Sequence, residues 1–514
     1  MIPKEMVMND KLLRNEDKMK SSQLLVTFLI LFISFLALQV SAGIVKEEYV
    51  GDAWEYAEIG DSLFSSGHFR LNDITSPITV WGGGDYRGFV FPILLGSCQH
   101  LDAYFGIEAG HIWWVVSSIL YAALFMVYLK FLKDIGIRKS EKYEIIRDFV
   151  PFILLLFFFY GLIIYTLTDL LASLLAILAA ELLLVTMNAT ETKKKLVSCF
   201  VCGEICYLTY NVRTIYLLEF IGILLTIFFV ESRQSTRLKI EQSELRIRRK
   251  WGMSFLCSGL LSVGFYTAAF PQVYLNFTRY RSISPLVRTN SLMSQQLWWG
   301  LGMSRYGTYV GNDGIHSAQM IFQDGTGMAI QNAFENAGEG ISLSSYLQAF
   351  LTYPFDVISI LWKHVWNAMF ILFPETYVRN LTKNRSIYVI LSLIIFIFFL
   401  FLLRNDLHLV CKKHLVNIER VLVIASLLLP TLAILPGAVE ERFLLVFYLM
   451  VYGRLAYCRS DDIRVFCNSK RYTWCSILMA LVIALTALTI ESEILSSLQG
   501  VNEIVPLLIN GKFT

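Results

Sequence analysis

Long apolar segments alternate along the chain with short polar ones. Each apolar segment approaches the length that a helix needs to cross the hydrocarbon core of a bilayer, about 20 residues. This pattern predicts an all-α polytopic membrane protein with about eleven transmembrane helices. The predicted spans lie near residues 24–40, 112–132, 149–165, 169–187, 197–212, 214–230, 252–270, 386–403, 421–436, 442–457 and 473–491.

Two longer segments, 41–111 and 271–385, interrupt this alternation. They divide the chain into an N-terminal segment 1–23, a first transmembrane module 24–270 that contains the 41–111 loop, the segment 271–385, and a second transmembrane module 386–514. Segment 271–385 is rich in Gly, Ser, Asn and aromatic residues, which predicts irregular loops with short helices.

The end of segment 271–385 contains an apolar stretch from Tyr353 to Glu375 that Lys363 and His364 interrupt. A helix lying on the membrane surface is the interpretation that best fits this mixture. A further spanning helix is the alternative, and it would invert the orientation of everything after it.

The composition excludes whole classes of protein. With 55% hydrophobic and 17% charged residues and a mean hydropathy of +0.56, the chain is not a soluble enzyme, a DNA-binding protein or a fibre. A net charge of +3 is too small to indicate a nucleic-acid partner.

Lysine and arginine are distributed unevenly between the two sides of the predicted topology. Most of the 44 such residues fall in segments 1–23, 133–148, 188–196, 231–251, 404–420 and 454–472. The positive-inside rule therefore predicts a cytoplasmic N-terminus, with both long segments external to a plasma or inner membrane. A cleaved signal peptide ending near Ser41-Ala42-Gly43 is the alternative for the first apolar segment, but the segment is longer than such peptides usually are.

Common metal and nucleotide motifs are missing from the sequence. No His-x-x-x-His or phosphate-loop pattern occurs. Cys199, Cys202 and Cys206 share one face of a predicted span, where helix packing is a better explanation than metal binding. No cofactor is predicted with certainty, and a divalent cation is left open.

The segment from Gly51 to Arg70 carries the most informative chemistry. Asp52 and Tyr56 are four residues apart and Glu55 is three from Asp52, so a helix places all three on one face. Two neighbouring carboxylates, partly desolvated at a bilayer edge, are expected to include one with a raised pKa, as a general base acting on a hydroxyl requires. The alternative is a solvated amphipathic helix with ordinary surface acids.

Three further charged residues lie at the predicted external ends of spans. Asp169 falls in a very short turn between two predicted spans. An ionisable group at the margin of a membrane is costly, which favours a functional role for Asp169; helix capping is the alternative. Arg213 and Arg442 are suited to an anion because a guanidinium offers two parallel donors to a phosphate. Snorkelling to lipid head groups would also explain these two arginines.

The order of these features resembles the GT-C membrane glycosyltransferases, which take sugars from polyprenyl phosphates. The resemblance is to the branch of protein O-mannosyltransferases and the lipid A aminoarabinose transferase. It covers residues 24–230 best and the remainder as topology only. It rests on the acidic signature Asp52–Gly67 with Tyr56, Ala57 and Leu63, on Tyr86–Pro92, on Thr168-Asp169, on Arg213, and on Glu441-Arg442-Phe443.

The resemblance implies catalytic roles for three acids. Asp52 would be the catalytic carboxylate and Asp169 the acid of the second loop. The family often has Asp and Glu adjacent, whereas Ala53 follows Asp52 here. Glu55 is therefore an alternative or assisting base.

The same resemblance implies a donor site and partners. Arg213, Arg442 and Arg87 would contact the donor phosphate, and Tyr56 would contact substrate. The implied partners are a polyprenyl-phosphate sugar donor, membrane lipids, and a glycan, lipid or protein acceptor. The expected reaction is inverting transfer to an acceptor hydroxyl at the external face.

Two other functions remain as alternatives. A polysaccharide polymerase or ligase would depend on arginines of the large loop, namely Arg279, Arg281, Arg288 or Arg305. A lipid-linked sugar flippase or transporter would show matched halves with broken helices, and no internal repeat is evident.

Overall fold

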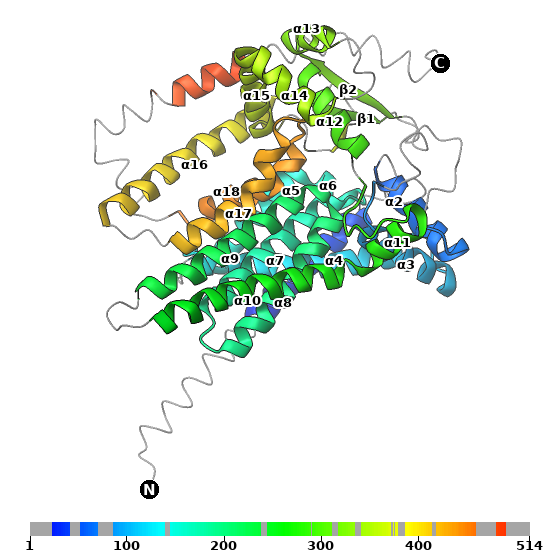
Figure 1. Cartoon of the computed structure of the whole chain (residues 1–514). Helices are drawn as coiled ribbons and strands as arrows, with labels where there is room; N and C mark the ends of the chain where they lie inside the picture. Colours follow the sequence, from blue (N-terminus) through cyan, green and yellow to red (C-terminus); the bar gives the residue numbers. More distant parts are fainter. Residues whose placement is uncertain are drawn as a thin grey trace.

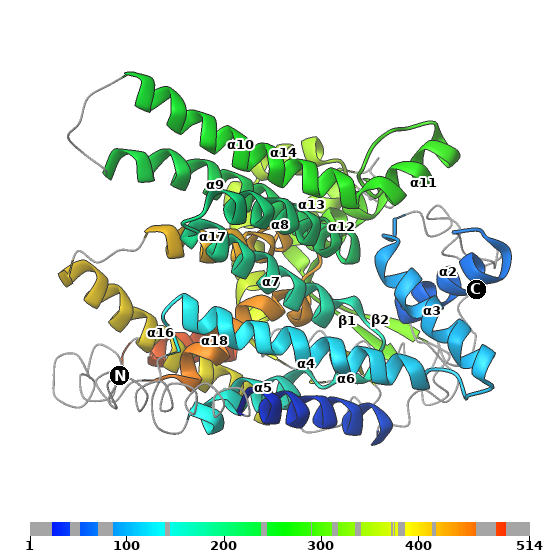
Figure 2. The same ribbon diagram turned by 90° about the horizontal axis from the view of Figure 1, so that it is seen from below.

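The structure is a computed structural model, and it shows a mostly helical protein (Figure 1). It describes residues 23–41, 52–69, 86–138, 144–237, 244–288, 290–310, 317–334, 341–371, 374, 376–378, 386–413, 418–458, 478 and 480–489. The predicted N-terminal segment 1–23 lies outside these residues except for Gln23. Figure 2 shows five long helices running in the same general direction: α4 (His111–Asp134), α7 (Thr168–Asn188), α8 (Thr192–Val212), α9 (Leu217–Arg237) and α10 (Glu244–Ala268). Helices α2 (Asp52–Ser66), α3 (Val90–Phe105) and α11 (Phe270–Tyr280) lie beyond one end of them.

Five described helices are long and apolar enough to cross a membrane, which supports a multi-pass membrane protein. They are Gln23–Ser41, His111–Asp134 in α4, Thr168–Asn188, which is α7, Thr214–Ser232 in η3 and α9, and Ile387–Asp406 in α16. A sixth span is formed if Gly252–Ala268 of α10 is counted together with α11 (Phe270–Tyr280), from which it is bent by 55°.

The other predicted spans also fall on helices, but these are shorter or less apolar. They are α5 (Glu144–Phe159) followed by α6 (Gly161–Ile164), α8 (Thr192–Val212), α17 (Ile418–Ile434) and α18 (Leu445–Ala456). Of the last predicted span, the structure describes residue 478 and the helix Ala480–Thr489. The total of eleven spans therefore stays a prediction.

Helices α8 and α10 (Glu244–Ala268) approach each other through glycines. A Cβ added to Gly203 would lie 1.9 Å from the carbonyl oxygen of Leu261, and one added to Gly264 would lie 2.0 Å from that of Phe200. Such close backbone contact is typical of helices packed in a membrane. Cys199, Cys202 and Cys206 are buried on α8, in agreement with the packing interpretation.

The prediction of an all-helical chain is wrong in segment 271–385, which contains a small sheet of order β2-β1-β3. Strand β1 (Met303–Val310) pairs antiparallel with β2 (Ser317–Gln323) and parallel with β3 (Tyr377–Val378). The glycines of 307–314 suggested a loop, but Tyr306, Thr308 and Val310 favour a strand once partners are available.

Helices surround this sheet. They are α12 (Asn290–Gly302), α13 (Gly325–Ala333), α14 (Leu343–Thr352) and α15 (Pro354–Met369), and they lie together at the top of Figure 1. The surface helix predicted from Tyr353 onward corresponds to α15, which is 16 residues long and is not among the candidate spans. That length favours the surface interpretation over a further span.

Helix α2 (Asp52–Ser66) is held against α3 (Val90–Phe105) by close contact and aromatic packing. Gly60 lies so near Gly96 that a Cβ on it would be 2.9 Å from the Gly96 Cα. The Tyr56 and Phe91 rings meet edge to face at 5.0 Å, and Phe91 meets Trp113 of α4 at 5.5 Å. These contacts set the direction in which the first turn of α2 points.

The segment before α3 is fixed to the end of α8. The side-chain Oδ1 of Asn211 accepts a hydrogen bond of 2.8 Å from the backbone N–H of Val90. Gly88 lies directly on the Asn211 backbone, where an added Cβ would be 1.8 Å from the carbonyl oxygen. Residue 87 is thereby brought beside residue 213.

Gly88→Ala is expected to lower stability by about 1–3 kcal/mol, because the added methyl group must displace backbone rather than a flexible side chain. Thermal unfolding in detergent measures this change. Gly259→Ala is the matched control, since a Cβ there meets nothing within 4 Å. Equal melting temperatures for the two variants would contradict the assigned Gly88–Asn211 contact.

Candidate functional site

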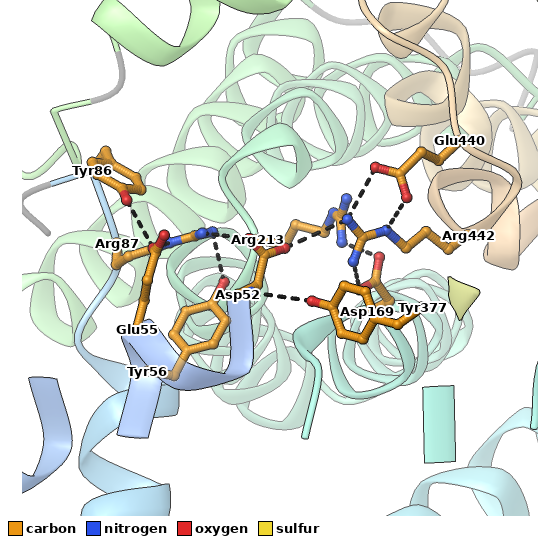
Figure 3. Close-up of polar contacts among 10 residues, drawn as sticks. All are labelled: Asp52, Glu55, Tyr56, Tyr86, Arg87, Asp169, Arg213, Tyr377, Glu440 and Arg442. Atoms are coloured by element: carbon orange, nitrogen blue, oxygen red, sulfur yellow. Dashed lines mark hydrogen bonds and ion pairs between the residues drawn. The ribbon is translucent and has the colours of Figure 1, made fainter. Parts of the chain in front are cut away.

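A cluster of charged side chains, most of them buried, lies where α7 begins and α8 ends (Figure 3). Five chain segments that are far apart in sequence supply the charged side chains: the first turn of α2, the residues before α3, the first turn of α7, the end of α8, and the residues in and before η4 (Glu441–Leu444). The charged members are Asp52, Glu55, Arg87, Asp169, Arg213, Glu440 and Arg442.

Arg87 organises one half of the cluster. Its Nη2 lies 2.7 Å from Asp52 Oδ1, and its Nε lies 2.6 Å from Glu55 Oε2. Its Nη1 donates to the Tyr56 hydroxyl at 3.0 Å, and the Tyr86 hydroxyl donates to Glu55 Oε2 at 2.8 Å. The guanidinium thus holds all three residues that the sequence places on one face of α2.

Arg442 connects the half of the cluster around Arg87 with the other half, which consists of Asp169 and Arg213. One of its terminal nitrogens lies 3.5 Å from Asp52 Oδ2, and the other lies 3.7 Å from Asp169 Oδ2. Asp169 also forms a close ion pair with Arg213. The Phe443 ring contacts both arginines, with the guanidinium carbon of Arg213 at 4.3 Å and that of Arg442 at 5.2 Å from its centroid.

Two residues of the cluster escaped the sequence analysis. Glu440 binds Arg442 through both carboxylate oxygens, at 2.6 Å from Nε and 3.0 Å from Nη2. The Tyr377 hydroxyl accepts a hydrogen bond of 3.1 Å from the Asp52 backbone N–H. Glu440 directly precedes the Glu441-Arg442-Phe443 motif, so its place in the sequence could have marked it as a site residue. Tyr377 lies 325 residues from Asp52, and nothing in its sequence surroundings indicates the contact.

The surroundings of Asp52 and Glu440 shift the pKa values of these two acids in opposite directions. Burial alone raises the pKa of Asp52, but the guanidinium groups of Arg87, Arg442 and Arg213 outweigh it and hold this pKa well below its usual range. Burial raises the pKa of Glu440 to about 7, although Arg442 opposes this shift. The expectation of a raised pKa is therefore wrong for Asp52, because its closest neighbours are cations rather than other acids.

The arrangement does not fit a metal ion held by protein side chains. Arginines separate the carboxylates of the cluster, and within the described ranges no group of three or more His, Cys, Asp or Glu side chains is placed to hold one.

Three site residues have surroundings that differ from those their alternative explanations require. The N-cap of α7 is Leu167 and has no side-chain capping bond, so Asp169 is not the capping residue. Glu55 is buried, unlike a solvated surface acid. The Arg442 side chain is 9% exposed and pairs with Asp52, Asp169 and Glu440.

All seven residues predicted from the sequence meet in this one cluster: Asp52, Glu55, Tyr56, Arg87, Asp169, Arg213 and Arg442. The structure shows that these seven residues lie close together, and their catalytic and binding roles stay predictions. Comparison of the chain with models of known protein families, with curated proteins and with solved structures finds no match.

Proposed function

We propose that this protein is a GT-C-type membrane glycosyltransferase that moves a sugar from a polyprenyl-phosphate donor to an acceptor hydroxyl. The observation that carries the proposal is the meeting of three arginines and a partly exposed carboxylate at the end of apolar spans. The Asp52 side chain is 35% exposed, against 2% for Asp169 and 8% for Glu55. Asp52 is thus the acid of this group most open to an acceptor.

The donor phosphate is proposed to bind Arg442 and Arg213. The contacts of Arg442 with Asp52 and Asp169 are the longest ion pairs in the cluster, 3.5 and 3.7 Å. A phosphate that accepts two parallel hydrogen bonds would engage Nη1, whose contact is the 3.7 Å one with Asp169, and would displace Asp52 and Glu440 from Nη2. The apolar spans next to the site offer a lipid environment to the polyprenyl chain.

Donor binding would also activate Asp52. In the structure its carboxylate faces both Arg87 and Arg442, which makes it a weak base. Once phosphate engages Arg442, one of these positive charges is neutralised and the pKa of Asp52 rises. The base would therefore become effective only when donor is present.

Glu55 suits a supporting role better than that of the base. Its Oε2 accepts hydrogen bonds from both Arg87 and Tyr86, and the residue is buried. It would hold Arg87 so that the guanidinium meets Asp52. The sequence leaves open whether Asp52 or Glu55 is the general base, and we propose Asp52.

The proposed reaction is a single displacement. The acceptor oxygen attacks the anomeric carbon while its proton passes to Asp52. The bond from that carbon to the phosphate oxygen breaks, and the bonding pair leaves with the polyprenyl phosphate. Arg442 and Arg213 stabilise the charge that develops on this leaving group. The configuration at the anomeric carbon inverts.

The polymerase alternative receives less support from the structure. Of the loop arginines that it would require, Arg305 is 2% exposed and lies 2.8 Å from Glu441, and it also donates to the Phe370 carbonyl at 3.0 Å. Arg288 lies against the Tyr280 ring at 3.8 Å. Arg305 is thus engaged within the fold and is poorly placed to contact a glycan.

Asp52→Asn is expected to lower sugar transfer at least about 100-fold, because the amide cannot accept the acceptor proton. Transfer of labelled sugar in reconstituted membranes measures this. Asp61→Asn, on an exposed position of the same helix, is the matched control and should keep full activity. An Asp52→Asn protein that elutes as folded and transfers normally would exclude Asp52 as the base.

Donor affinity is expected to fall as the pH rises through about 7. Below that value Glu440 is protonated and competes weakly with phosphate for Arg442, whereas above it the ionised carboxylate holds the guanidinium. The dissociation constant for a polyprenyl-phosphate sugar should rise by about tenfold per pH unit at most above 7. Glu440→Gln should remove this dependence, and an identical pH profile in that variant would refute the role of Glu440.

A further inference from the structure

Helices α14 and α15 expose a row of large apolar side chains. Phe355 is 85% exposed and Leu351 is 78% exposed, although neither helix is a candidate span. The positions recur every three or four residues, so each helix carries its members on one face. The row consists of Leu343, Leu347 and Leu351 on α14 and of Phe355, Ile358 and Trp362 on α15.

This row does not belong to the hydrophobic core of the module that the small sheet and helices α12 to α15 form. Both helices bury a different face in one cluster with α12 and α13, through Tyr346 and Ala349 on α14 and Val357 and Ile360 on α15. The hydrophobic core of the module is therefore complete without the exposed row. Something outside the module must account for it, since large contiguous apolar surfaces are rare on proteins that meet only water.

A second exposed row, one residue further along, is polar. It consists of Ser344, Gln348, Thr352, Asp356 and Ser359. One residue corresponds to about 100° around a helix, so each helix presents an apolar face and a polar face side by side. That division is typical of a helix lying at a membrane surface, with one face in lipid and the other in water.

The apolar row is joined to a candidate membrane span through buried aromatic rings. Trp362 contacts Trp366 edge to face at 5.4 Å, and Trp366 stacks on Phe370 at 5.6 Å. Trp366 and Phe370 share a buried cluster with Val389 and Leu393 of α16 (Ser386–Lys413). The same end of α16 exposes Ile387, Ile390 and Ile394, as a lipid-facing span does.

We infer that α14 and α15 rest on the leaflet at the site end of the bundle, with the row from Leu343 to Trp362 in contact with acyl chains. Trp362 is the member of the row that contacts the aromatic rings packed against α16, and tryptophan favours the boundary between lipid and water. The row contains no charged side chain that would specify a protein partner. The leaflet would thus support the module whose strand β3 carries Tyr377 against Asp52.

Site-specific photo-crosslinking in native membranes tests this inference on the full chain. Benzoylphenylalanine is placed singly at Leu351 or Phe355 in the apolar row and, as matched controls, at Thr352 or Asp356 in the polar row. Mass spectrometry after illumination then identifies what each position has bound. Because all four side chains are exposed, the substitutions leave the core unchanged, and elution on size exclusion verifies folding.

Phospholipid adducts at Leu351 and Phe355, with at least about tenfold fewer at Thr352 and Asp356, are the expected result. A crosslinked homodimer at the apolar positions would overturn the inference in favour of a second copy of the chain. Adducts with another polypeptide, equal lipid labelling of both rows, or no adduct at all would overturn it as well. None of these outcomes depends on whether the chain transfers sugar.

Discussion

Charge compensation at the edge of the bundle is the constraint on which this structure depends. Isolated charges are costly to remove from water, and a buried ion pair is retained only with close partners. Here each acid of the cluster faces an arginine, and each arginine faces at least one acid. The seven charges lie on five segments, so pairing them also fixes how α2, α7, α8 and η4 meet.

This compensation leaves one part of the cluster able to rearrange. Four acids face three arginines, and Glu440, whose pKa lies near 7, can take up the proton that relieves the excess negative charge. Arg442 faces three of the four acids, more than either other arginine, and its contacts with the two aspartates are the longest ion pairs of the cluster. An incoming anion would therefore rearrange Arg442 first, while Arg87 keeps α2 in place.

The sequence predicts the parts of this molecule whose signals are local. Hydropathy locates the five described helices that are long and apolar enough to cross a membrane, and a spacing of three and four residues places Asp52, Glu55 and Tyr56 on one helical face. The ends of spans mark Asp169, Arg213 and Arg442 as groups at a common margin. Spacing does not show which residues pair across the fold. The bridge by Arg442 and the contact from Tyr377 join segments more than 300 residues apart, and the lowered pKa of Asp52 depends on Arg87 together with Arg442 and Arg213. The glycines near β1 favoured a loop, and β3, which has only two residues, is recognisable as a strand only through its pairing with β1.

The central claim is that a polyprenyl-phosphate sugar is the donor. Its most direct test offers a panel of polyprenyl-phosphate monosaccharides, each labelled in the sugar, to the reconstituted full chain with native membrane extract as acceptor source. One donor should be consumed, with release of free polyprenyl phosphate and inversion at the anomeric carbon. If no donor of the panel is consumed while the extract is present, the proposed sugar transfer from polyprenyl phosphates is wrong.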